Sequence, residues 1–470
     1  METPQHDAMK RRDFLSTVAC GAVGVAAGTT ALHGEESSVR KPNVIFAFSD
    51  EHRWHSMSLS GMPGLQTPNM VQMAEQGVSF TNCISNYPVC SPYRAILMTG
   101  RWPYQQGVID NAIKLKPREM TLGKAFKGAG YTTGYVGKWH LGGARAEPYG
   151  FDLSLVWSGT NDHWQSRYHP KEGKPVATTE YNATLMTDQA LEFIDDNRQR
   201  PFFLMLSWNP PHSNFTDPPE EKTALYPDQA LIPYRPNLRA RKARNAEIRQ
   251  KREQRHWAMH QGYHAHVSAI DDELGRVMRK LDELGIANDT LLIYSSDHGS
   301  MLGSHGVGGK RQPHEESIKT PFLARWPGKV PAGTCSEALL GAIDVMPTVC
   351  GLAKVPVPAS CEGHDLSQTV LGGTGPQPES QFIMHISKEH ASGGQKHPAP
   401  LFRGVTTGRY TYAVYPDRPW CLFDNREDPY QQTNLIDDPA HADTRKAMRA
   451  MLADWLKKSR DPFTIPAEKG

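Results

Sequence analysis

Cysteine 90 stands in a segment whose residue types could do chemistry. Pro92 and Arg94 follow it at short spacing, which places a thiol on a constrained turn beside a cation. A nearby positive charge stabilises the thiolate and makes a cysteine a better nucleophile. From these residues alone, a reactive cysteine, a cysteine hydrolase and a buried structural cysteine all remain open.

Acidic side chains follow two apolar runs. Asp50 and Glu51 come after the run 43–48, and Asp297 and His298 come after the run 291–294. Oxygen donors gathered at strand ends suit a hard cation such as Ca²⁺ or Mg²⁺. Taken singly, each pair would be an ordinary solvated strand end.

A longer stretch around the cysteine, Cys90-Ser91-Pro92-Tyr93-Arg94 with Leu97-Met98-Thr99-Gly100, resembles the signature of the sulfatase family. These are the formylglycine-dependent type I sulfatases of the alkaline phosphatase superfamily. The segment Gly137-Lys138-Trp139-His140-Leu141-Gly142 matches a second family motif. The resemblance covers nearly all of the chain after its N-terminal segment. It implies that Cys90 is converted to formylglycine (3-oxoalanine) by a formylglycine-generating enzyme or an anaerobic sulfatase-maturating enzyme.

The same resemblance implies a divalent cation, usually Ca²⁺, with Mg²⁺ as the alternative. The implied cation ligands are Asp50, Glu51, Cys90, Asp297 and His298. The implied catalytic residues are Cys90, Arg94, Lys138, His140, His212 and Lys310. Two ligand positions depart from the commoner pattern, because Glu51 stands where Asp or Gln is usual and His298 where many relatives have Asn.

The implied chemistry is hydrolysis of a sulfate ester. Hydrated formylglycine carries two hydroxyls, so that one can attack sulfur and the other can serve product release. Lys138 and Lys310 would stabilise charge on the sulfate oxygens, and His212 would donate to the sulfate or the leaving oxygen. His140 is the candidate base for product release, and Arg94 would hold the formylglycine in place.

Residues that could contact a substrate are dispersed along the chain. An exported enzyme meets sulfated polysaccharides, so we expect a sulfated carbohydrate. The candidate contact residues are Asn161, Asp162, His163, His314, His385 and His390. Two other functions stay open: a phosphate or phosphonate ester hydrolase of the same superfamily, and a non-catalytic binder of sulfated glycans.

Several short apolar runs alternate with helical patterns. Continuous apolar strands are typical of a sheet buried on both faces. We therefore expect an α/β fold with a large mixed, mostly parallel central sheet flanked by helices. In such sheets ligands bind beyond the carboxyl ends of the strands, where the polar clusters occur here.

Changes in residue composition and patterning divide the chain into three parts. Residues 1–35 are predicted to be an export signal, residues 40–355 the catalytic α/β domain, and residues 356–470 a smaller α+β subdomain. Pro- and Gly-rich segments after residue 355 separate short β-like pieces, and a terminal helix follows. The last part is therefore predicted to contain a small antiparallel sheet.

The N-terminal segment indicates export. Lys10-Arg11-Arg12-Asp13-Phe14-Leu15 precedes a weakly apolar run at 17–32, which resembles a bacterial twin-arginine signal. The expected location is the periplasm or the medium, with the twin-arginine machinery as a partner and no membrane span in the mature protein. A net charge of +2 gives no reason to expect nucleic acid as a partner.

Overall fold

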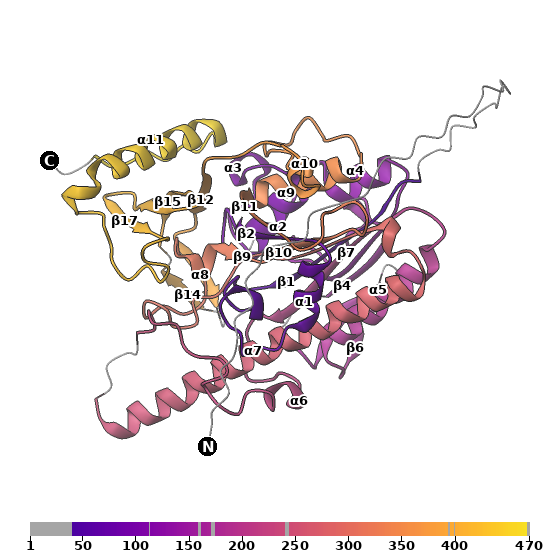
Figure 1. Cartoon of the computed structure of the whole chain (residues 1–470), viewed down its shortest axis with the longest axis horizontal. Coiled ribbons are helices and arrows are strands. Elements are labelled where there is room, and N and C mark those ends of the chain that lie inside the picture. Colours follow the sequence, from indigo (N-terminus) through magenta and orange to yellow (C-terminus); the bar gives the residue numbers. More distant parts are fainter. Residues whose placement is uncertain are drawn as a thin grey trace, which may run out of the picture. The chain divides into compact units, whose positions relative to one another are not determined.

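In the computed structural model, the long apolar runs form adjacent strands of one sheet (Figure 1). The structure describes residues 40–467 except 112, 158–160, 171–173, 240–243, 393–394 and 399, and only the backbone is described from 389 to 398. The predicted signal, residues 1–35, lies outside the described residues. The described strands of this sheet run in the order β11-β2-β10-β8-β1-β7-β3-β4-β5-β6, with β9 paired to β2. Their bounds are β1 Asn43–Asp50, β2 Val78–Ile84, β3 Thr132–Lys138, β4 Leu153–Trp157, β5 Ser166–His169, β6 Val176–Thr178, β7 Phe202–Pro211, β8 Thr290–Ser296, β9 Lys319–Thr320, β10 Phe322–Arg325 and β11 Thr334–Gly341.

The middle of the sheet is parallel. Strand β1 pairs in parallel with β7 and β8, and β3 pairs in parallel with β7 and β4. Strand β10 is antiparallel to both of its neighbours, as are β5 and β6 where they extend the other edge. The predicted α/β fold with a mixed, mostly parallel sheet is confirmed.

Both faces of the sheet are buried, which explains the continuous apolar runs. In β1, Val44, Phe46 and Phe48 belong to one hydrophobic core, whereas Ile45 and Ala47 belong to the core on the other face. Successive side chains of a strand point to opposite faces, so a strand covered on both sides needs apolar residues at every position.

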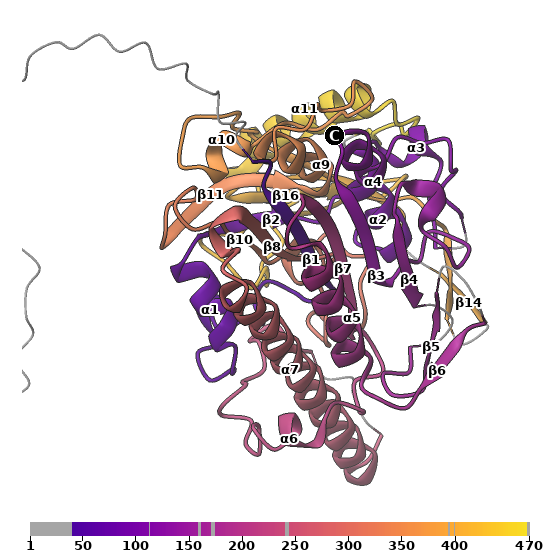
Figure 2. The same cartoon turned by 90° about the vertical axis from the view of Figure 1, so that its right-hand side faces the viewer.

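Helices cover the two faces separately (Figure 2). Side chains of α2 (Cys90–Thr99), α4 (Leu122–Gly128) and α9 (Ala342–Leu352) pack into the first core. Those of α1 (Pro68–Glu75), α5 (Asn182–Asn197) and α7 (Ala246–Glu283) pack into the second. Shorter helices are α3 Pro103–Gln106, α6 Glu220–Thr223, α8 Glu315–Ile318 and α10 Ser367–Val370. Among the described residues, no helix is both long and apolar enough to cross a membrane.

A smaller antiparallel sheet follows in the C-terminal part, as expected. It consists of β12 (Gln381–His385), β15 (Phe402–Thr406), β16 (Tyr410–Val414) and β17 (Pro419–Asp424), and α11 (Ala442–Ser459) packs against β15 and β16. Strands β13 (Glu389–Ser392) and β14 (Gln395–Pro398) form a separate pair. Phe382 and Tyr412 of the small sheet share the first hydrophobic core with Phe46. The domain boundary near residue 355 stays a prediction.

Buried histidines should make this fold sensitive to acid. Burial lowers the pKa of His55 to about 4, that of His260 to about 3 and that of His385 to about 4. Each of these histidines has a lower pKa in the folded protein than in the unfolded chain, so protonation favours unfolding. The free energy of unfolding is therefore unaffected by these groups above pH 6.5 and falls as the pH drops below that value. We expect each of these side chains to lower the free energy of unfolding by about 2 kcal/mol between pH 7 and pH 5. Urea unfolding at the two pH values measures the loss.

A single substitution can isolate one of these contributions. His260→Gln should shrink the difference between pH 7 and pH 5, because it removes one buried titrating group. His364→Gln is the control, since the hydrogen bond that His364 donates to Asp344 raises the pKa of His364 and that ring is half exposed. Equal stability of the parent protein at both pH values would contradict the prediction.

Candidate active site

The carboxyl ends of four adjacent strands bring the predicted site residues together. Asp50 is the last residue of β1, Lys138 is the last of β3, His212 follows β7 and Asp297 follows β8. Parallel neighbours end at the same edge of a sheet, so residues far apart in the chain meet there. Cys90 is the first residue of α2, which packs on one face of the sheet. The predicted turn at Cys90 is thus a helix start.

The Cys90 thiol lies at the centre of this group. Its Sγ is 3.3 Å from His298 Nε2, 3.3 Å from Lys310 Nζ and 3.7 Å from Asp50 Oδ1. Burial opposes ionisation of the thiol, but Lys310, Lys138 and His298 together hold its pKa well below the usual value. The start of a helix adds a favourable dipole for a negative group at this position.

Arg94 joins the two central carboxylates. Its Nη2 donates to Asp50 Oδ2 at 3.0 Å and to Asp297 Oδ2 at 3.2 Å. Its Nη1 donates to the carbonyl oxygen of Lys138 at 2.7 Å and to Ser207 Oγ at 2.8 Å. Arg94 therefore positions the acidic residues and holds them against the end of β3, in addition to its predicted place beside the nucleophile.

The acidic group has the chemistry of a cation site. Asp50, Asp297 and His298 each offer a ligand atom, and with Cys90 Sγ these atoms lie within 4.8 Å of one another. Burial, and next the charge of Asp50, raises the pKa of Asp297 to about 7. Two fully buried carboxylates so close together repel each other, and a bound divalent cation would offset that repulsion. Their oxygens suit Ca²⁺ or Mg²⁺. The residues present therefore fit the expected ion.

Glu51 lies on the other side of Asp50. Its Oε2 is 3.1 Å from Lys310 Nζ and 3.5 Å from His212 Nε2. Burial opposes its ionisation, yet Lys310 and His212 keep the pKa of Glu51 below the usual value. Its carboxylate joins a second group with Asp50 and His212, so its predicted ligation of the cation stays a prediction.

The other predicted catalytic side chains surround the thiol. Lys138 Nζ is 2.7 Å from Asp50 Oδ2. Burial, then Lys138 and Lys310, lowers the pKa of His212, and its Nδ1 is 2.8 Å from the carbonyl oxygen of Ser213. His140 interacts with the Cys90 thiol, and its Nδ1 is buried without a hydrogen-bond partner among the described residues. All six predicted catalytic residues thus meet at one place.

The predicted substrate contacts are not gathered in the same way. Asn161 is exposed, and Asp162 Oδ1 accepts from the backbone N–H groups of Trp164 and Gln165 at 2.9 Å. His163 is fully buried, which argues against direct contact with a substrate in this conformation.

The remaining three candidates lie in or near the small C-terminal sheet. His314 is buried against the rings of His305 and Phe423. His385 is buried, and its Nδ1 is 2.8 Å from the carbonyl oxygen of Pro400. His390 lies in β13, and its side chain is outside the described part of the structure. Substrate roles for these residues stay predictions.

Sequence reasoning missed two supporting residues. Ser207 near the end of β7 accepts from Arg94, and Ser85 Oγ donates to the carbonyl oxygen of Asp297 at 2.7 Å. Serines are common after strands, so nothing in their spacing distinguishes these two. Only the position of Arg94 and Asp297 in space identifies them.

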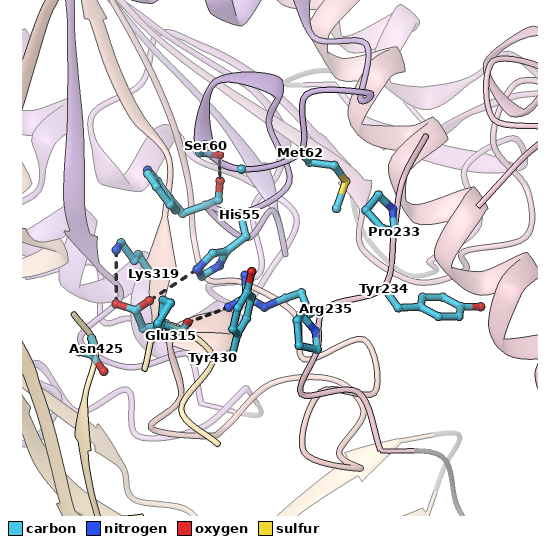
Figure 3. A pocket seen from close by; sticks show the side chains of 14 residues that line it. His55, Ser60, Met62, Pro233, Tyr234, Arg235, Glu315, Lys319, Asn425 and Tyr430 are labelled. Atoms are coloured by element: carbon cyan, nitrogen blue, oxygen red, sulfur yellow. Dashed lines mark hydrogen bonds and ion pairs between the residues drawn. The ribbon is translucent and has the colours of Figure 1, made fainter. Parts of the chain in front are cut away.

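A separate pocket of about 290 Å³ is lined by His55, Arg235 and Glu315 among others (Figure 3). Tyr234 and Tyr430 add aromatic rings to its wall, but its cations are already paired. Arg235 bonds to Glu316, and Lys319 bonds to Glu315. None of the predicted catalytic or cation-binding residues is among the described residues that line it.

Comparison with known proteins identifies the family. A family profile described as Sulfatase matches residues 42–355, and one described as N-sulphoglucosamine sulphohydrolase, C-terminal, matches residues 303–458. The chain is 30% identical over 445 residues to the ulvan-active sulfatase of Formosa agariphila, across 91% of this chain and 84% of that protein. It is 26% identical over 502 residues to the N-acetylglucosamine-6-O-sulfatase of Bacteroides thetaiotaomicron, across 91% of this chain and 88% of that protein.

The fold agrees with this assignment. The structure of the sulfatase yidJ from Bacteroides fragilis superposes with a TM-score of 0.80 at 25% identity, across 92% of this chain and 99% of that one. The family profile covers more than half of the chain, and the residues of the family motif meet at one buried site. The chain therefore belongs to the sulfatase family and is an enzyme of that family.

Proposed function

We propose that the protein hydrolyses a sulfate monoester on a sulfated carbohydrate, using a formylglycine made from Cys90 and a bound Ca²⁺, with Mg²⁺ as the alternative ion. The surroundings of Cys90 carry the proposal. Its buried Sγ lies at a helix start, between the cation Lys310 and the acidic group of Asp50. The names of the two relatives, one ulvan-active and one acting on N-acetylglucosamine-6-O-sulfate, support a sulfated sugar.

The cation would be held by Asp50, Asp297 and His298, with Arg94 keeping the two carboxylates in place. When bound, the ion would lower the pKa of one hydroxyl of the hydrated aldehyde and supply a nucleophile near neutral pH. Arg94 donates to one oxygen of each carboxylate, which leaves Asp50 Oδ1 and Asp297 Oδ1 free of that bond. Arg94 thus fixes the ligands without removing their capacity to bind.

The sulfate group would be bound by cations of the chain. Lys138 and Lys310 are both buried and lie beside position 90, so their charge acts in a medium of low polarity. Nδ1 of His212 contacts the carbonyl oxygen of Ser213, and this contact orients Nε2 toward Glu51 and the active site. A bound sulfate anion would raise the pKa of His212, so that Nε2 can give a proton to the leaving oxygen.

His140 would act as the base when sulfate is released. Its φ of +53° places it in a tight left-handed turn after β3, and its carbonyl oxygen accepts from Ser91 Oγ at 2.5 Å. That bond ties the turn to the start of α2. The imidazole of His140, which interacts with the side chain at position 90, would then accept a proton from that group.

The protein is proposed to work outside the cytoplasm of a bacterium. The twin-arginine pattern at 10–15 supports export to the periplasm or the medium in folded form. Sulfated polysaccharides are met there, which agrees with the proposed substrate class. The maturation enzyme would then have to act on Cys90 before export.

The decisive experiment compares ester classes on matured protein. Intact mass first establishes that oxygen has replaced sulfur at position 90. Initial rates are then measured on sulfated mono- and oligosaccharides, a phosphate monoester and a phosphodiester. We expect the highest kcat/KM on a sulfated sugar. A preference for the phosphate or phosphonate class would support the other hydrolases of the superfamily, and an intact thiol without turnover in native protein would support a glycan binder.

A further inference from the structure

Three side chains from separate segments meet away from the Cys90 group. His163 lies between β4 and β5, Asp217 lies in the loop that follows His212, and His266 lies in α7. The two histidine side chains are fully buried, and the Asp217 side chain is 21% exposed. The cluster shares no residue with the predicted catalytic set.

The ligand atoms have the spacing of a small coordination site. His163 Nδ1 is 2.8 Å and His266 Nε2 is 3.3 Å from Asp217 Oδ1, and the three ligand atoms lie within 4.8 Å of one another. Ligands about 2.0–2.1 Å from a tetrahedral zinc ion stand roughly 3.3 Å apart. Shifts of a few tenths of an ångström would therefore admit an ion.

A contact from outside the cluster orients one of the two rings. Tyr181 Oη is 2.7 Å from His266 Nδ1 and holds that ring with Nε2 toward Asp217. An outer contact of this kind is the usual way in which a metal-binding histidine is oriented.

We propose that His163, Asp217 and His266 bind a Zn²⁺ ion, separate from the cation of the active site. Two imidazoles and one carboxylate suit zinc, whereas Ca²⁺ prefers oxygen ligands alone. A water molecule can complete four ligands on the exposed side of Asp217. The ion would join the segment at 161–164, the loop after His212 and helix α7.

The placement gives the ion a structural role near the active site. The carbonyl oxygen of Asn214 is 3.2 Å from His266 Nε2, and the indole of Trp164 donates to the carbonyl of Asp217 at 2.7 Å. The loop that follows His212 is thus held to α7 at Asn214 and to the segment 161–164 at Asp217. Zinc would fix this loop without taking part in ester cleavage.

The test uses the full chain carrying Cys90→Ala, His212→Ala and His298→Ala, which removes the sulfur and nitrogen donors from both possible metal-binding groups of the active site. Metal-free protein is titrated with Zn²⁺ in excess Ca²⁺, and bound zinc is counted by mass spectrometry after gel filtration. We expect one zinc per chain. Adding Asp217→Asn or His266→Gln should weaken binding at least tenfold, whereas His264→Gln, a buried neighbour in α7, should leave it unchanged.

A second measurement does not depend on how the variants fold. X-ray absorption at the zinc edge of this starting chain, without the Asp217 or His266 substitution, should show nitrogen and oxygen ligands with scattering from two imidazoles. Absence of bound zinc, zinc retained equally by Asp217→Asn and His266→Gln, or a spectrum without imidazole scattering would each overturn the proposal.

Discussion

Replacing Cys90 with alanine is expected to lower turnover of a sulfated sugar by at least about 10⁴-fold, the scale on which removal of an essential nucleophile acts. The side chain at this position lies within reach of Lys310, His298 and Asp50 together. Alanine leaves the cations and the acidic pair in place but removes the attacking atom. Steady-state rates on the best substrate measure the effect.

Cys83 supplies the matched control. It is also a buried cysteine, but burial raises the pKa of its thiol to about 12, and Thr320 Oγ1 donates to its Sγ at 3.4 Å. Cys83→Ala should therefore keep activity and change stability alone. Wild-type rates in Cys90→Ala, or full activity of native protein that carries an unconverted thiol, would refute the mechanism.

Removal of the divalent cation is expected to lower kcat by about 10³-fold, since a bound metal contributes several kcal/mol to charge stabilisation in such sites. A chelator should produce the loss, and added Ca²⁺ should reverse it. Asp297→Asn should reproduce the loss without the chelator, because it takes a charge from the buried pair that Arg94 holds together.

Two controls keep this second result interpretable. Asp417→Asn changes an exposed carboxylate paired with Arg418 at the surface, and it should leave the calcium response unchanged. Circular dichroism of the chelated protein separates loss of the ion from loss of the fold. A chelated protein that stays folded and fully active would contradict a catalytic role for the cation.

The pattern of apolar residues along short segments was enough to predict the central sheet of this protein. Each of the central strands is a short apolar run because both faces of the sheet are covered, and that information lies within eight or ten consecutive residues. The family motif at 90–100 likewise predicts the position of the nucleophile without any tertiary information. Both signals are carried by neighbouring residues, so they survive in a sequence read alone.

The contacts of the site were decided by the order of the strands. Asp50 and Asp297 are separated by most of the chain, yet β1 and β8 are neighbours, and Arg94 reaches both carboxylates. The same geometry turns Glu51 toward Lys310 and buries His163 beside Asp217. The spacing of residue types along the sequence does not predict these side-chain contacts.

By itself, then, the sequence predicted the position of the nucleophile, the acidic and basic residues that meet around it, and a mostly parallel sheet to carry them. Tertiary structure alone decided which carboxylate pairs with which cation, and which histidines are closed to solvent. The physical reason is that side-chain type and strand pattern depend on local chain chemistry. Burial and charge pairing depend on packing between segments that are far apart in the sequence.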